Sequence, residues 1–337
     1  GDYVENSYSY ANDRLTGIGH NGMTYGFEYN RFGQGTKTTI GTQALMTNSY
    51  GAKNGLLQRS TYGNGTYVDN VYDKLERLTA RKYNGVVKHE WVYDNSGRLA
   101  IERDLENSRY YYYTYDMLGR LWDLRTTDNS QITYEYNKLN QVVGTRYVYK
   151  DEKRETGYEY RKGGIPKETT LPNGAAVTQE LNGLAQVSRR EVKTGANKAW
   201  ETEYSYYSPS AGYTSNVVNG VKHSAAGLDL TYEYDQYGNI TKVKENGEEK
   251  VRYTYDTLGE VVREDNRYLG LSVRYNYDNG GNIQSRWEYA YTTGELGSPG
   301  NEGAYSYGNA AWPDQLTAYE GETITYDALG GPLRYRD

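Results

Sequence analysis

The sequence contains no cysteine, and it is poor in several other residues that mark common protein classes. The missing thiols exclude disulfide bridges and thiolate metal sites from its 337 residues. Acidic residues number 44 against 38 Lys and Arg, for a net charge of −6, so no basic footprint for DNA or RNA is expected. Neither a signal peptide nor an apolar run of membrane-spanning length is present, and we expect no membrane insertion.

Tyrosine is what the sequence has in excess. There are 41 tyrosines but only 2 phenylalanines and 5 tryptophans, so nearly every aromatic side chain has a polar tip. Disordered chains lack aromatic and β-branched residues, whereas Tyr, Val and Thr are abundant here and proline occurs only 6 times. These features predict a folded β protein whose apolar surface is mostly tyrosine ring.

The tyrosines belong to a repeat with a period of 21 or 22 residues. The stretches "VYDNSGRLA" from Val92, "TYDMLGRLW" from Thr114 and "EYDQYGNIT" from Glu233 are three of its copies. The period links Tyr29, Tyr50, Tyr72, Tyr93, Tyr115 and Tyr136, and again Tyr234, Tyr255 and Tyr277. Between these runs, over residues 150–230, the copies are looser. We expect one repeat array over residues 1–337 as a single domain.

Each copy contains the elements of a β-turn. A type I turn favours Asp or Asn at its first position and Gly at its fourth, and the aspartate can accept hydrogen bonds from backbone amides two residues on. We therefore predict bulged hairpin turns, each preceded by its tyrosine. The structural motif residues are Tyr93, Asp94 and Gly97; Tyr115, Asp116 and Gly119; Tyr234, Asp235 and Gly238; Tyr255, Asp256 and Gly259; Tyr277, Asp278 and Gly281; and Tyr326, Asp327 and Gly330. Asn140 is a tolerable replacement for the glycine, and Glu76 a strained one.

Side chains alternate along a strand, so tyrosines two residues apart share a face. In a bulged hairpin, the residue before the aspartate lies opposite the apolar residue two after the glycine. This geometry predicts the cross-strand pairs Tyr115–Leu121, Tyr93–Leu99, Tyr234–Ile240 and Tyr277–Ile283.

A second reversal in each repeat comes from pairs such as Asn84-Gly85 and Asn246-Gly247, a strong signal for a two-residue hairpin. The fold class that follows is all-β, a repetitive antiparallel meander. Because open sheets of more than about ten strands curl or split, we expect the strip to coil into a spiral or a barrel-like wall. The Gly-rich stretch at residues 294–303 predicts a loop insertion at about 292–304.

The regular "YDxxGRL" copies resemble the YD repeats of the rearrangement-hotspot (RHS) family, over nearly the whole chain. That family includes bacterial polymorphic toxins, shell proteins of insecticidal toxin complexes, and teneurins. Stretches such as "HNGMTYGFEYNRFGQGTK" and "WPDQLTAYEGETITYDALGGPL" look like RHS proteins of Gram-positive bacteria in particular.

The resemblance implies a non-enzymatic shell or scaffold of a secreted or cell-surface bacterial protein, enclosing or presenting a toxin or effector domain. The abrupt start at "GDYVENSYSY" leads us to expect a fragment of a longer protein, with Gly1 as a cloning remnant. The self-cleavage element "DPxG" of the family is missing, and Gly331 replaces its usual asparagine. No plug, self-cleavage site or toxin is therefore expected within these residues.

Other chemistries have weaker signals. "GIGHNG" (residues 17–22) matches a dinucleotide fingerprint, but an alternating strand-like stretch follows it rather than a helix, so we interpret it as a turn. His20, His89 and His223 lie in different repeats without metal-ligand spacing. The carboxylate pairs Glu201/Glu203, Glu102/Asp104 and Glu248/Glu249 are interpreted as charged outward faces. We expect no enzyme, cofactor or metal.

One alternative function remains open at this stage. Surplus tyrosines, such as those at residues 110–113 and 204–207, can stack on sugar rings, which would make the chain an extracellular carbohydrate-binding or adhesion module that recognises cell-surface glycans. The competing interpretation is that they pack the sheet face and tie repeats together through hydroxyl hydrogen bonds.

Overall fold

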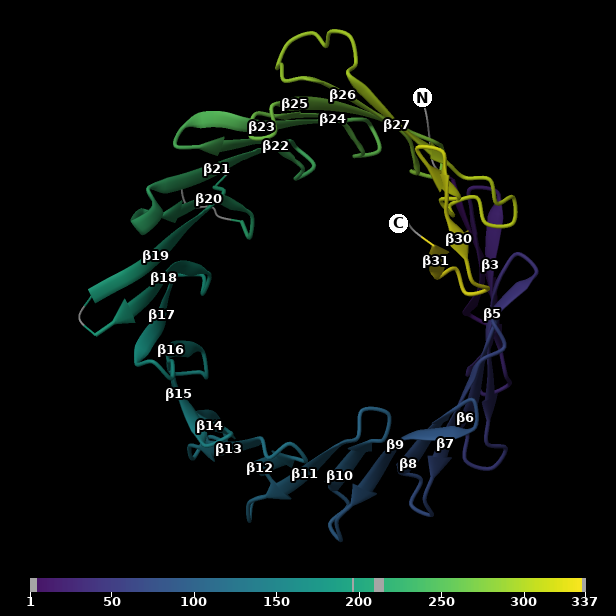
Figure 1. Ribbon diagram of the computed structural model, residues 1–337, viewed down its shortest axis with the longest axis vertical. Helices are drawn as coiled ribbons and strands as arrows, with labels where there is room; N and C mark the ends of the chain where they lie inside the picture. The colour runs from purple at the N-terminus through teal and green to yellow at the C-terminus, as the bar shows by residue number, and fades with distance from the viewer. Residues whose placement is uncertain (1–4, 196, 209–214, 335–337) are drawn as a thin grey trace. The chain divides into compact units, whose positions relative to one another are not determined.

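The computed structural model describes residues 5–195, 197–208 and 215–334. Strands β1 to β29 belong to one 29-stranded sheet, and β30 and β31 form a separate two-stranded sheet. In the described residues the only helical element is the short 3₁₀ helix η1 (Ser224–Ala226). Most strands of the described residues follow one another in chain order through short turns (Figure 1). The predicted all-β antiparallel meander is confirmed.

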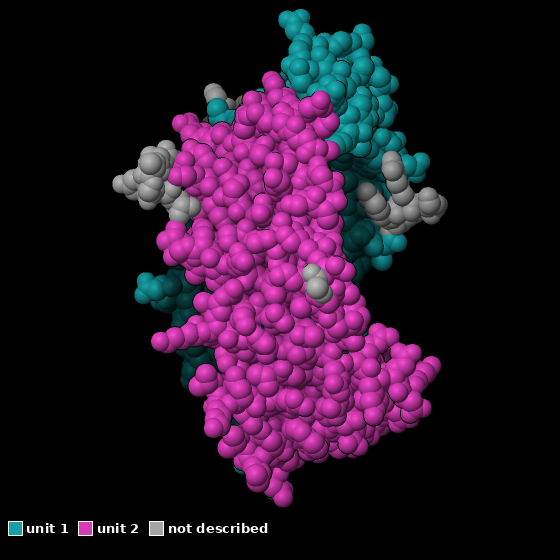
Figure 2. All heavy atoms as spheres, turned by 90° about the vertical axis from the view of Figure 1, so that its left-hand side faces the viewer, with its two compact units in different colours: residues 1–90, 253–337 teal, residues 91–252 magenta. Residues whose placement is uncertain are grey.

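The chain divides into two compact units, shown in different colours in Figure 2. Unit 1 comprises residues 1–90 and 253–337, and unit 2 comprises residues 91–252. The expected single domain stays a prediction.

Unit 1 contains the first and the last strands. They are β1 (Asn6–Ala11), β2 (Arg14–His20), β3 (Met23–Tyr29), β4 (Gly35–Ile40), β5 (Gln43–Tyr50), β6 (Leu57–Tyr62), β7 (Tyr67–Tyr72), β8 (Leu78–Tyr83), most of β9 (Val86–Tyr93), β24 (Val261–Asn266), β25 (Leu271–Tyr277), β26 (Ile283–Ala290), β27 (Asn301–Ser306), β28 (Ala318–Tyr319), β29 (Glu322–Thr323), β30 (Thr325–Tyr326) and β31 (Pro332–Arg334).

Unit 2 contains the strands between them. They are β10 (Leu99–Asp104), β11 (Arg109–Tyr115), β12 (Leu121–Thr126), β13 (Gln131–Tyr136), β14 (Val142–Tyr149), β15 (Glu152–Tyr160), β16 (Pro166–Thr170), β17 (Ala175–Leu181), β18 (Val187–Thr194), β19 (Asn197–Tyr206), β20 (Val218–His223), β21 (Leu228–Tyr234), β22 (Ile240–Glu245) and most of β23 (Glu248–Tyr255).

The register of the YD hairpins has a bulge next to each tyrosine. Tyr115 lies opposite Leu121, and the register shifts between Thr114 and Tyr115. Tyr234 lies opposite Ile240, and Tyr277 lies opposite Ile283, with the same shift. Three of the four predicted cross-strand pairs are therefore confirmed, while Tyr93–Leu99 stays a prediction.

The opposite ends of the strands are closed by the tighter turns. Asn84 and Gly85 have φ values of 48° and 84°, and Asn246 and Gly247 have φ values of 52° and 83°. Positive φ at both central residues is the geometry of the two-residue type I′ hairpin, which matches the twist of the flanking strands. The reversals predicted at these Asn-Gly pairs are confirmed.

The predicted insertion is shorter than expected. The connection between β26 and β27 covers residues 291–300, because Asn301 already pairs with Glu288 of β26. The start of this connection is tied to the sheet, since the carbonyl of Thr292 accepts hydrogen bonds from Ser272 Oγ at 2.9 Å and from Arg263 Nη2 at 2.8 Å. Ser272 is fully buried beneath it.

The sheet does not bury a continuous apolar core. The buried apolar side chains of the described residues are few and dispersed, namely Met23, Ile40, Ala175, Val251, Val273 and Ile324. Buried polar side chains are as prominent, among them Asp123, Glu191, Glu201 and Asp265. Most strand residues are half-buried by their cross-strand neighbours, so the contacts within the sheet have to supply most of its stability. No helix in the described part of the chain is long and apolar enough to cross a membrane.

Candidate functional site: the YD turns and the charged face of the sheet

The turn after β11 shows how the motif residues work together. Asp116 Oδ1 accepts hydrogen bonds from the backbone amides of Leu118 and Arg120, both at 2.9 Å. The turn closes with a bond from the Gly119 amide to the Asp116 carbonyl, also 2.9 Å, and Gly119 has φ +80°. That left-handed conformation favours glycine. The bond from the Arg120 amide is the main cause that holds the pKa of Asp116 below its ordinary value.

The other predicted motif residues occupy the same places. The glycines with left-handed φ values are Gly97 (82°), Gly238 (91°), Gly259 (83°), Gly281 (82°) and Gly330 (84°). The aspartates that accept two backbone amides through Oδ1 are Asp94, Asp235, Asp256, Asp278 and Asp327. Asparagines begin equivalent turns at Asn30, Asn137 and Asn182. These turns therefore use the Oδ1 acceptor and do not need the charge.

Three of the described YD-type turns have a residue other than glycine at the left-handed fourth position. Glu76 has φ 64° and Asn140 has φ 61°, as the sequence indicated. Ala185, at φ 60°, is a third case that the sequence analysis did not identify. Because a Cβ atom makes this conformation unfavourable, Glu76 and Ala185 are strained.

The motif tyrosines join each repeat to the one before it. The hydroxyl of Tyr136 donates to the carbonyl of Leu121 at 2.7 Å, and that of Tyr115 donates to the carbonyl of Leu99 at 2.8 Å. Further bonds of this kind run from Tyr234 to Val218, from Tyr277 to Val261 at 2.8 Å, and from Tyr326 to Leu316 at 2.6 Å. Tyr93 and Tyr255 end β9 and β23 in the same way. The sequence analysis considered such hydroxyl ties only for the surplus tyrosines, whereas the structure forms them at the motif tyrosines.

Burial of these phenols changes their acidity. Desolvation raises the pKa of Tyr115, Tyr136 and Tyr234 above the ordinary value, and it raises the pKa of Tyr277 to about 12. The hydroxyls therefore remain protonated donors under all physiological conditions.

The arginine that follows the turn glycine contacts the next repeat, whereas the tyrosine hydroxyl contacts the preceding one. Arg120 Nε donates to Asp116 Oδ2 at 2.7 Å, while its guanidinium carbon lies 4.4 Å from the ring centroid of Tyr136. Arg98 bonds Asp94 Oδ2 at 2.8 Å and lies 4.5 Å from the ring centroid of Tyr115. Each such arginine thus fixes its own turn and stacks on the tyrosine of the next repeat, a cation–π contact.

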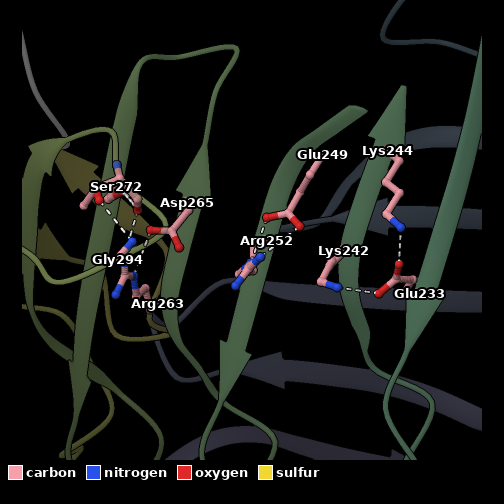
Figure 3. Close-up of polar contacts among 10 residues, drawn as sticks. Glu233, Lys242, Lys244, Glu249, Arg252, Arg263, Asp265, Ser272 and Gly294 are labelled. Carbon is pink, nitrogen blue, oxygen red and sulfur yellow. Dashed lines mark hydrogen bonds and ion pairs between the residues drawn. The ribbon is translucent and has the colours of Figure 1, made fainter. Parts of the chain in front are cut away.

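Residues that alternate with the tyrosines carry charges on the opposite face of the sheet. In unit 2, Glu233 forms ion pairs with Lys242 at 2.7 Å and with Lys244, and Glu249 pairs with Arg252 at 2.7 Å (Figure 3). Glu233 lies directly opposite Lys242 in the register of β21 and β22, and this pair of opposite charges stabilises that register.

The most buried part of this charged face lies on β18 and β19. The carboxylates of Glu191 and Glu201 are surrounded by Arg189, Lys193 and Lys198, with Lys193 Nζ at 2.7 Å and Arg189 Nη2 at 2.5 Å from Glu191, and with Lys198 Nζ at 2.5 Å from Glu201. The bond from Lys198 is the main cause that lowers the pKa of Glu201 to about 2. These carboxylates are neutralised by three cations, which makes the cluster an ion-pair network.

Glu201 lies on the charged face of the sheet, but its carboxylate is buried there. Only 6% of this residue is exposed, because the cations of β18 and β19 cover its carboxylate, whereas Glu203 is exposed. The other predicted carboxylates are half-buried or exposed. Glu102 accepts a hydrogen bond from the hydroxyl of Tyr113 at 3.0 Å. Burial of this tyrosine and the bond to Glu102 both raise its pKa.

A groove of about 650 Å³ adjoins this cluster in unit 2. Its charged lining includes Arg189, Glu203 and Lys222. Gly220, which also lines the groove, lies between Ser205 and Thr231 in the register of three strands, and Ser205 Oγ occupies the place that a Cβ atom on Gly220 would take.

The histidines and the glycine fingerprint have structural roles. Residues 17–22 form the end of β2 and an Asn-Gly turn into β3, which confirms the interpretation as a turn. His20 lies near Asp314, His89 contacts the ring of Tyr83, and His223 lies 2.9 Å from Thr202 Oγ1. The described residues contain no group of three or more His, Asp or Glu that could hold a metal ion.

The two tyrosine-rich stretches do not form an exposed platform. Tyr112 is 41% exposed and Tyr207 is 47% exposed. Tyr110, Tyr111 and Tyr113, like Tyr204 and Tyr206, are half-buried in the sheet. Packing within the sheet accounts for most of these rings.

Comparison with known proteins gives a likeness in fold. A crystal structure of TcdB2-TccC3 without its hypervariable C-terminal region matches 97% of this chain, with a TM-score of 0.60 and 13% sequence identity. The chain shares that β fold. It covers 20% of the TcdB2-TccC3 chain. A second structure, of TcdB2-TccC3, aligns with a TM-score of only 0.36 and carries no argument.

In sequence, the chain is 27% identical over 171 residues to double-stranded DNA deaminase toxin A of Burkholderia cenocepacia (strain H111). The match covers 49% of this chain and 11% of the toxin, so the chain corresponds to a small part of that protein. No protein-family model matches the chain.

Two features of the site were missed from the sequence. Stacking of an arginine on the next tyrosine was readable in principle, because the arginine and the tyrosine each recur with the repeat period, from Arg98 to Arg120 and from Tyr115 to Tyr136. The buried cluster of Glu191 and Glu201 had no such signal, since its charges meet only in the register of β18 and β19.

Proposed function

We propose that this chain is part of the wall of a β-strip shell in a longer, secreted bacterial protein of the RHS type. In this proposal the shell encloses a toxin or effector domain, and the repeats have no catalytic role. The observation that carries the proposal is the chain of tyrosine hydroxyl bonds, such as Tyr136 to Leu121, which ties each repeat to its predecessor.

A wall needs continuity along the chain and two faces that tolerate water. The YD motif supplies the continuity, because Tyr, Asp, Gly and Arg are each used in closing a turn or in joining neighbouring repeats. Paired charges such as Glu233 with Lys242 cover the face opposite the tyrosines. These uses leave the prominent polar side chains engaged in structure, which favours a scaffold over an enzyme.

The relatives support the proposed partner and location. The chain resembles TcdB2-TccC3 in fold and part of a deaminase toxin in sequence, so a toxin or effector domain of the same polypeptide is the proposed cargo. The absence of cysteine is compatible with export, and we propose a secreted protein. Glycan binding is not favoured, because the tyrosine-rich stretches are largely packed in the sheet.

Protease protection of the natural polypeptide tests this proposal. The full-length protein and its separately produced C-terminal domain are digested with trypsin, and cleavage within that domain is followed by mass spectrometry. Enclosure predicts that the domain is cleaved much more slowly in the full-length protein than alone. Equal cleavage rates would contradict enclosure, and denaturing the full-length protein before digestion provides the control for accessible cleavage sites.

A further inference from the structure

The last YD turn differs from the others in what binds its aspartate. Asp327 Oδ1 accepts the amides of Leu329 at 2.9 Å and Gly331 at 2.8 Å, as in the other turns. The fourth residue after this aspartate is Gly331, which has no side chain to offer the second oxygen, Oδ2. In five other turns a side chain at that position donates to Oδ2, and these pairs are Arg77–Asp73, Arg98–Asp94, Arg120–Asp116, Asn239–Asp235 and Asn282–Asp278.

A side chain at position 331 would begin close to this carboxylate. A Cβ atom at Gly331 would lie 3.3 Å from Asp327 Oδ1 and 3.5 Å from Oδ2, so a longer side chain at this position would start beside the carboxylate. Among the described residues, no hydrogen bond or ion pair to Asp327 Oδ2 is formed. The carboxylate therefore keeps the acceptor site that arginine or asparagine fills elsewhere.

This carboxylate lines a cavity of about 580 Å³ within unit 1. Trp312, Gln315 and Gln43 line it as well. Trp312 packs against the turn itself, since a Cβ atom on Gly330 would come within 2.6 Å of the indole ring. An aromatic ring and a carboxylate in one cavity resemble the surroundings of Arg98 and Arg120, which bind an aspartate and stack on a tyrosine.

The charge of the surrounding chain favours a cation. Residues 287–333 contain no lysine or arginine, although they include seven acidic residues. The acidic residues are Glu288, Glu295, Glu302, Asp314, Glu320, Glu322 and Asp327. Such a segment attracts basic partners and repels acidic ones.

We propose that the cavity at Asp327 is a docking site for an arginine side chain of a basic partner segment. The guanidinium donates to Asp327 Oδ2 and lies against Trp312, in the role that Arg98 and Arg120 fill within their own repeats. Arginine fits better than lysine because its planar group both binds a carboxylate and stacks on an aromatic ring. The Gly331 position thus leaves open, for a partner, a contact that the five turns named above satisfy internally.

A peptide titration tests this site on the protein labelled with 5-fluorotryptophan. The probe is acetyl-Gly-Arg-Gly-amide, and the fluorine resonance of Trp312 is assigned with the Trp312→Phe variant. The expected result is a saturable shift of that resonance, with a Kd of about millimolar order for a single side chain. The peptide with citrulline, the neutral isostere of arginine, should bind about ten times more weakly, because the charge of the guanidinium is lost.

Two variants and a control decide the assignment. Asp327→Asn removes the charge but keeps the turn, since Asn30, Asn137 and Asn182 begin equivalent turns, and it should abolish the shift. Gly331→Arg should abolish it by filling the site from within the chain. Asp235→Asn, at a turn whose Oδ2 is already bound by Asn239, should leave it unchanged. Equal shifts with arginine and citrulline, or a full response in Asp327→Asn, would overturn the proposal.

Discussion

At the scale of the residue, tyrosine is the one side chain that satisfies both demands of this array. Its ring packs against an aliphatic cross-strand partner, as Tyr115 does opposite Leu121, and its hydroxyl reaches the backbone of the preceding repeat. Phenylalanine would fill the same face without the second contact. This explains why 41 tyrosines accompany only 2 phenylalanines.

The hydroxyl tie can be measured at Tyr136. Tyr136→Phe keeps the ring and removes the bond to the Leu121 carbonyl, so it should lower the free energy of unfolding by about 0.5–1.5 kcal/mol. Urea unfolding followed by circular dichroism gives this difference. The matched control is Tyr112→Phe, which removes a hydroxyl from a 41% exposed tyrosine and should change the stability little. Equal effects at the two positions would refute the tie.

One turn carries a glutamate where others carry arginine. Burial, together with a hydrogen bond to Asp256, raises the pKa of Glu260 above its ordinary value. The folded state therefore favours the protonated carboxyl, and its stabilising contribution, present in acid, is lost as the pH rises through the raised pKa. Glu260→Arg should increase the stability at neutral pH by about 0.2–1 kcal/mol through a new pair with Asp256.

Glu260→Gln serves as the control for this change, because it removes the repulsion without adding a cation. Thermal unfolding should rank the proteins at neutral pH as Glu260→Arg, then Glu260→Gln, then wild type. A Glu260→Arg protein that is less stable than wild type at neutral pH would show that this turn does not accept the arginine geometry of Asp116 and Arg120.

At the scale of the element, the hairpin is set by a few local residues and was readable from the sequence. The turns at Asn84-Gly85 and Asn246-Gly247 and the register of Tyr277 with Ile283 follow from rules that involve only neighbouring residues. The buried pair of Glu191 and Glu201 was not predictable, because it depends on which residues of two strands lie opposite each other. The position of Gly220 opposite Ser205 in the lining of the groove was not predictable for the same reason.

The strain at the left-handed turn position can be tested by adding a Cβ atom at one turn and removing it at another. Gly119→Ala should destabilise the protein by about 1–2 kcal/mol, since its φ is +80° while no neighbouring atom blocks the added methyl group. Ala185→Gly should stabilise it by up to about 1 kcal/mol, because it relieves the same strain at a small entropic cost.

Gly183→Ala is the control for this pair, because Gly183 lies in the same turn as Ala185, with open space around it and without a positive φ. It should be close to neutral. Denaturant midpoints of the three variants provide the comparison, and a Gly119→Ala protein as stable as wild type would contradict the strain argument.

The ion-pair cluster of β18 and β19 makes a pH-dependent contribution. The pKa of Glu201 falls from an ordinary value of 4.5 to about 2, so its contribution is present above the ordinary value and is lost as the pH falls through about 2. Glu201→Gln should therefore lower the stability most near neutral pH, and the difference from wild type should shrink in acid. Urea unfolding over this pH range tests the prediction. A difference that does not change with pH would mean that the charge of Glu201 contributes nothing.

At the scale of the whole molecule, the repeats combine into two compact units of one fold. Stability in such arrays comes from contacts between neighbouring repeats, so a long chain needs no large apolar core. This accounts for the few buried apolar side chains, such as Ile40 and Val273. The repeat period predicted an array of repeats that contact their neighbours, whereas the division at residues 90 and 252 had no marker in the sequence.

The central claim is that this array is a wall around another domain. Cryo-electron microscopy of the natural full-length polypeptide tests it most directly, because it places the repeats and the remaining domains in one map. Enclosure predicts that the YD strands form the wall of a shell and that the toxin or effector domain lies inside it. A map in which the repeats form a separate module, with the other domain outside and exposed to solvent, would contradict the claim.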